Sequence, residues 1–151
     1  LIYLDFPKDE PIDIEENLLI NEAINYTPVE LLKGKDDILA IFNDEDIILD
    51  MAPDFDKLKH LESRGLIVSA KSTKFDFVSR FFAPQSGINE DPVTGSAHTV
   101  LVPYWSKKLM KTKMTAFTMR VNFFLITQTL KQKYKKLFLI WKKTLMNIWM
   151  M

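Results

Sequence analysis

The sequence predicts an α+β fold in which a mostly antiparallel sheet packs around one long helix. Two observations support this. Short apolar segments follow one another closely between turn residues, as in antiparallel sheets. A longer segment, 94–109, repeats apolar residues every three to five positions, as a half-buried helix does. The 151 residues, 47% of them hydrophobic and 26% charged, suit one soluble domain with its own core.

The N-terminal quarter of the chain is predicted to hold one strand and one helix. Residues 2–6 alternate in polarity and stop at Pro7, as a strand end does. Residues 11–26 place apolar side chains at helical spacing, and a short helical turn is expected over 28–32.

The next segments predict a hairpin and a second helix. Residues 38–42 and 47–51 are both mainly apolar, and the asparagine and three acidic residues at 43–46 between them favour a turn. The helix over 54–61 starts with acidic residues, which are favourable at a helix N-terminus. We expect Gly65 to end it.

The centre of the chain predicts two further strands before the long helix. Residues 66–70 are mainly apolar, residues 75–82 are rich in phenylalanine, and Pro84 stops the second segment. The helix over 94–109 contains Pro103, which removes one backbone hydrogen bond and favours a kink. We see no internal repeat.

Charge divides the chain in two although its formal net charge is zero. Residues 1–117 carry all 20 acidic side chains and a net charge of −7, whereas residues 118–151 carry +7 without any acid, glycine or proline. The absence of cysteine excludes disulfides and thiolate chemistry and agrees with a cytoplasmic protein. The only two histidines are too few for a histidine-rich metal site.

The segment 87–98 is the strongest functional signal. It places Asp91, Thr94, Gly95, Ser96 and His98 at the expected start of the long helix. A helix start offers unpaired N–H groups and a partial positive charge, which can hold a carboxylate. An aspartate before proline can also simply start a turn, and Gly-Ser can simply close one, so both interpretations stay open.

These residues resemble the family of phenazine-biosynthesis PhzF isomerases. The resemblance is carried by residues 76–84, 87–98 and 103–105, and weaker similarity extends from Leu1 to Phe117. It implies a diaminopimelate epimerase-like lobe, with a curved, mostly antiparallel sheet around a central helix, here incomplete at both ends. It also implies isomerisation of a small carboxylic acid by proton transfer, without metal or organic cofactor, as for trans-2,3-dihydro-3-hydroxyanthranilate in phenazine biosynthesis.

The resemblance also assigns roles to individual residues. Asp91 matches the catalytic acid that orients the substrate, and Gly95 and Ser96 match the residues that bind the substrate carboxylate. We expect His98 to be structural as readily as functional, and Arg80 to pair with an acidic side chain rather than line the cleft.

The family's main proton carrier, a glutamate of the first lobe, has no matching motif here. We therefore expect residues 1–10 to be the end of the first lobe and 11–117 to be the second lobe. Beyond residue 117 the family's glycine pair is missing. The acid-free composition of 118–151 led us to the hypothesis of a basic, aromatic tail translated out of frame.

Three functions were weighed. The first is a PhzF-like isomerase present in a truncated, inactive form, and the second a non-catalytic module that binds a small acid. The third treats the tail 118–151 as genuine, with a basic, aromatic helix over 130–145 that binds a partner or an anionic membrane surface. Binding of nucleic acid is not expected, no segment could span a membrane, and the resemblance leaves a homodimer open.

Overall fold

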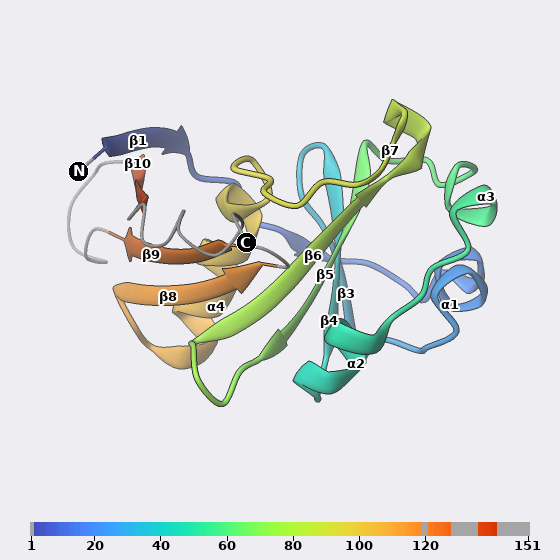
Figure 1. Ribbon diagram of the computed structural model, residues 1–151, viewed down its shortest axis with the longest axis horizontal. Coiled ribbons are helices and arrows are strands. Elements are labelled where there is room, and N and C mark those ends of the chain that lie inside the picture. Colours follow the sequence, from blue (N-terminus) through green and yellow to red (C-terminus); the bar gives the residue numbers. More distant parts are fainter. Residues whose placement is uncertain (1, 119–120, 128–135, 142–151) are drawn as a thin grey trace, which may run out of the picture.

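A computed structural model describes residues 2–118, 121–127 and 136–141, with side chains from residue 6 to residue 118. Its elements, shown in Figure 1, are β1 (Ile2–Pro7), β2 (Ile12–Asp13), α1 (Leu18–Ile24), β3 (Glu30–Lys33), β4 (Asp37–Phe42), α2 (Glu45–Asp50), α3 (Phe55–Leu58), β5 (Gly65–Lys71), β6 (Phe77–Ala83), the 3₁₀ turn η1 (Pro84–Ser86), β7 (Ile88–Glu90), α4 (His98–Leu109), β8 (Lys113–Thr118), β9 (Val121–Thr127) and β10 (Lys136–Trp141).

The described strands form a single curved sheet. Its order is β1-β10-β9-β8-β6-β5-β4-β3-β2, with β7 paired to β6 outside this path. Only the β4–β5 and β6–β8 pairs are parallel among the described strands. The prediction of a mostly antiparallel α+β sheet is therefore confirmed.

The central strands are buried on both faces because each face carries its own helices. In β4, Leu39 and Ile41 belong to the core cluster that contains α4. Their neighbours Ile38, Ala40 and Phe42 belong to a second cluster with residues of α1, α2 and α3. Figure 1 shows α4 within the curve formed by β8 and β9 and the three short helices on the other side of β4 to β6. The prediction of a central helix is confirmed. The layer formed by α1, α2 and α3 on the other face of the sheet was not part of that prediction.

Two aromatic side chains join α4 to the sheet. Phe77 is completely buried and stacks on Trp105, with ring centroids 5.9 Å apart. The indole N–H of Trp105 donates to the Ser69 hydroxyl at 2.9 Å, and that hydroxyl donates to the Val78 carbonyl at 2.7 Å. Because these buried polar groups are all paired, α4 has a fixed position against β5 and β6.

The predicted hairpin over 38–51 is wrong. Its second half is the helix α2, whose N-cap Asp44 accepts a hydrogen bond from the Asp46 N–H at 2.9 Å. Strand β4 instead pairs with β3 on one side and β5 on the other. The turn expected over 28–32 is also wrong, since β3 begins at Glu30.

The predicted helices exist but are shorter than expected. The segment 11–26 contains β2 first, and α1 begins only after Asn17, whose side chain accepts from the Ile20 N–H. The helix predicted over 54–61 is α3, capped by Asp54. The helix predicted over 94–109 is α4, which begins at His98, so residues 94–97 lie in the turn before it; Pro103 lies inside it as expected.

The described part of residues 118–151 is extended. Strands β9 and β10 pair with each other, and β10 also pairs with β1. A basic helix is therefore wrong for residues 136–141; the other residues of that proposed helix, 130–135 and 142–145, lie outside the described residues. No described helix has the length and apolar character needed to cross a membrane. The domain boundaries at residues 10 and 117 and the out-of-frame hypothesis stay predictions.

Candidate functional site

The polar segment 87–98 leaves the sheet from β6 and returns as α4. Gly87 has φ +83°, a conformation that glycine adopts without strain, and it closes η1. Strand β7 then pairs back onto β6, and the Asp91 N–H donates to the Phe81 carbonyl at 3.1 Å. These contacts fix where Asp91 emerges from the sheet.

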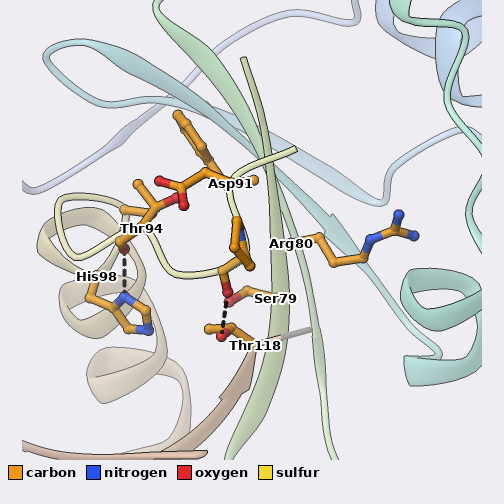
Figure 2. Close-up of a pocket in the computed structure, with 9 residues that line it drawn as sticks. Ser79, Arg80, Asp91, Thr94, His98 and Thr118 are labelled. Carbon is orange, nitrogen blue, oxygen red and sulfur yellow. Dashed lines mark hydrogen bonds between the residues drawn. The ribbon is translucent and has the colours of Figure 1, made fainter. Parts of the chain in front are cut away.

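Asp91 starts a turn and also lines a small cavity. Its Oδ1 accepts a hydrogen bond from the Val93 N–H at 3.1 Å, so the structural interpretation holds. The side chain is partly exposed and lines a cavity of about 10 Å³ with Thr94, His98 and Thr118. Figure 2 shows Asp91 beside Thr94, with His98 below them on α4. The Thr94 hydroxyl is buried and has no hydrogen-bond partner among the described residues.

His98 is neutral, and its ring holds the backbone of this turn. Its Nδ1 lies 3.0 Å from the Thr94 carbonyl, and a carbonyl only accepts, so Nδ1 carries the proton. Burial lowers the pKa of His98 to about 4, against a smaller raising effect of that hydrogen bond. A neutral histidine is therefore built into the base of the site, in agreement with a structural role.

The buried His98 predicts a loss of stability in mild acid. In the unfolded chain a histidine takes up a proton near pH 6.5, whereas folded His98 does so only near pH 4. Protons therefore favour the unfolded state between these values, and the free energy of unfolding should fall by about 2 kcal/mol from pH 7 to pH 5. Urea unfolding at several pH values measures this; His98→Gln should flatten the dependence, and His60→Gln, at an exposed position, should retain it. An unchanged slope in His98→Gln would contradict the assignment.

Gly95 and Ser96 form the turn ahead of α4. The N–H groups of Gly95, Ser96 and Ala97 donate to no described residue, whereas their carbonyls already accept from the first residues of α4. A Cβ at position 95 would lie 3.3 Å from the Phe6 ring, so Phe6 and a small residue at 95 fit each other. The turn thus presents free donors just ahead of the first residue of α4; the role of Gly95 and Ser96 in binding stays a prediction.

Ser96 lies beside a cation that the sequence did not indicate. The Arg64 guanidinium donates through Nη2 to the Ser96 hydroxyl at 3.0 Å and binds Asp37 through Nε at 2.9 Å and through Nη2. Asp37 has a side chain only 2% exposed, while that of Arg64 is 40% exposed. All three residues line a cavity of about 270 Å³, whose other lining residues are Phe6, Pro7, Lys8, Asp9, Lys35, Asp36 and Thr99. This volume is near the lower end for small-molecule sites and suits a ligand with a single ring.

The predicted site residues are neighbours in one turn, but their side chains line two different hollows. Asp91 lines the small cavity and Ser96 the large one. Arg80 also belongs to the lining of the small cavity, but Figure 2 shows its side chain running away from Asp91 and Thr94, and it forms a bidentate pair with Glu90 at 2.8 and 2.9 Å. The expectation that Arg80 pairs with an acid is confirmed.

No metal site is evident in the part of the chain that the structure describes, where no three histidine, aspartate or glutamate side chains are grouped to hold an ion. The large cavity places the Ser96 hydroxyl beside three cations, Lys8, Lys35 and Arg64, and three carboxylates, Asp9, Asp36 and Asp37.

Comparison with known proteins identifies the family. The phenazine biosynthesis-like protein family, PhzC-PhzF, matches residues 4–123. An uncharacterized isomerase of Pseudomonas aeruginosa is 50% identical over 115 residues, which are 75% of this chain and 43% of that protein. The mouse phenazine biosynthesis-like domain-containing protein 1 is 38% identical over 132 residues, covering 77% of this chain and 45% of that protein.

A solved structure agrees with the fold. The crystal structure of a PhzF family protein from Enterococcus faecalis superimposes with a TM-score of 0.83 at 35% identity, over 91% of this chain and 52% of that one. The chain therefore belongs to the PhzC-PhzF family. It spans less than half the length of these curated relatives and about half of the solved one.

Proposed function

We propose that this chain carries the carboxylate-binding turn and the acid of a cofactor-independent isomerase that moves a proton on a small carboxylic acid in the cytoplasm. The observation that carries the proposal is the row of free N–H groups at Gly95, Ser96 and Ala97, of which Ser96 lines the cavity of about 270 Å³ and Ala97 the small cavity beside Asp91. Family membership and the relatives named as isomerases support the type of reaction.

The residues of the turn and Asp91 have different roles in the proposed reaction. The free N–H groups and the Ser96 hydroxyl bind the substrate carboxylate, since together they supply several donors and no negative charge. Asp91, three residues before the buried Thr94, is placed to orient a polar substituent of the substrate and to accept or return a proton. A ligand that contacts both Asp91 and Ser96 must extend from the small cavity to the large one past Gly95.

We further propose that the chain as given binds the acid without completing the isomerisation. A proton shift between two carbons needs a group that removes the proton and returns it elsewhere, and no segment of this sequence matches the family's proton-carrying glutamate. The chain would then behave as a module that binds a small acid.

Proton NMR of trans-2,3-dihydro-3-hydroxyanthranilate in D₂O with the 151-residue chain tests both parts. We expect saturation transfer from protein to ligand, reduced in Ser96→Ala, and no deuterium exchange or isomerisation above the protein-free rate. Absence of saturation transfer would refute the site. Catalysed exchange that disappears in Asp91→Asn would refute the expected inactivity and show a complete isomerase.

A further inference from the structure

Arg64 is a cation that the family resemblance did not assign, and it occupies a defined place in the large cavity. Its guanidinium is fixed by Asp37, whose buried carboxylate accepts from both Nε and Nη2. A bidentate arginine pair of this kind is geometrically specific as well as strong. The guanidinium plane therefore has one orientation relative to the turn that contains Ser96.

The hydrogen bond from Arg64 determines the direction in which the Ser96 hydroxyl can donate. Nη2 donates to Ser96 Oγ at 3.0 Å, so this oxygen already accepts one hydrogen bond from a cation. No described residue accepts the hydroxyl proton of Ser96, and it is repelled by the guanidinium charge. The hydroxyl is thus oriented as a donor away from Arg64, in a residue that lines the cavity.

Arg64 and the backbone of Ser96 supply further hydrogen-bond donors near the Ser96 hydroxyl. Arg64 Nη1 donates to none of the described residues, and the Arg64 side chain is 40% exposed in the same cavity. Arg64 Nη1, the Ser96 hydroxyl and the free N–H of Ser96 thus form a local group of hydrogen-bond donors, in a cavity that Asp9 and Asp36 also line together with Lys8 and Lys35. Such a surface favours a ligand with anionic oxygens over one that presents N–H groups.

We propose that Arg64 is a positioning residue of the carboxylate site: held by Asp37, it fixes the Ser96 hydroxyl as a donor into the cavity and so selects ligands that carry a carboxylate. The inference rests on the proposed function and adds to it the residue that sets its ligand preference. It also assigns a role to the buried Asp37, which restricts the orientation of Arg64, because an exposed arginine without such a partner would sample many orientations.

Calorimetric titration of the full chain with anthranilate and with its neutral amide, anthranilamide, tests the inference. Arg64→Lys keeps the positive charge but loses the fork and the bond to Ser96, and we expect it to weaken anthranilate binding about tenfold or more. Binding of anthranilamide should change less than about twofold. Lys35→Gln, which removes a cation from the same cavity without touching Ser96, is the matched control and should cost less than about threefold at physiological salt.

A double-mutant cycle shows whether Arg64 acts through Ser96. The variant Arg64→Lys with Ser96→Ala should bind anthranilate no more weakly than the weaker of the two single variants. Additive losses, or equal losses for acid and amide, would overturn the inference while leaving the proposed function intact. If the unmodified chain does not bind anthranilate, both are overturned. If Arg64→Lys does not fold, Arg64→Gln combined with Asp37→Asn removes both charges and gives the same comparison.

Discussion

Replacement of Arg80 by alanine is expected to lower the free energy of unfolding by about 3–5 kcal/mol. The Arg80 side chain is 7% exposed and that of Glu90 is 21% exposed. Arg80 Nη1 also donates to the carbonyls of Ile48 at 3.0 Å and Met51 at 2.6 Å. Its removal leaves a largely buried carboxylate and two carbonyls without donors, while Arg80→Lys, which keeps the charge, should lose less.

Urea unfolding measures this effect, with equal m-values required for the comparison. Lys108→Ala is a suitable control because Lys108 also pairs with a glutamate, Glu30, at 2.7 Å, but from a side chain that is 49% exposed. We expect that variant to lose less than about 1 kcal/mol. A similar loss in both variants would show that Arg80 does not join α2 to the sheet as described.

Phe77→Ala is expected to cost about 3–5 kcal/mol through the cavity that it leaves. Phe77 is completely buried, stacks on Trp105 and lies 6.3 Å from the His98 ring, measured between centroids. Its loss should therefore loosen the start of α4 as well as destabilise the fold. Near-ultraviolet circular dichroism should report the change at Trp105 in addition to the lower unfolding midpoint.

The neighbouring Phe75 provides the control for Phe77. It is only partly buried and stacks on Phe117, with centroids 5.6 Å apart. Phe75→Ala should cost about 1 kcal/mol, the size of an exposed aromatic pair with little burial. If the two substitutions cost the same, α4 is not supported by Phe77 as the structure indicates.

The strands of the core could be predicted because their sequences leave little choice. Residues 66–70 are apolar apart from Ser69, and they form β5 with both faces covered. The segment 47–51 is just as apolar, yet it is the helix α2. Its hydrophobicity could not distinguish the two, because the places beside β4 are filled by β3 and β5, which lie elsewhere in the sequence.

The polar segment 91–96 was also predictable as a distinct feature, because it combines small, hydroxyl and acidic residues over six positions, although residues 94–96 were predicted as helix and lie in the turn before α4. The contribution of Arg64 could not be predicted from the sequence. It arises from the parallel pairing of β4 with β5, which sets Asp37 opposite Gly65 and so places Arg64 beside Asp37. A single sequence does not reveal such a pairing, and the hairpin expected after β4 hid it. Periodicity therefore predicts elements better than it predicts which charged residues meet.

The claim that the turn before α4 is a small-carboxylate site can be tested most directly by titrating the ¹⁵N-labelled chain with anthranilate and following its amide resonances. We expect saturable shifts at Gly95, Ser96 and Ala97, whose N–H groups have no acceptor among the described residues, and little change in α2 on the opposite face of the sheet. Resonances of these three amides that do not move at saturating anthranilate would contradict the account.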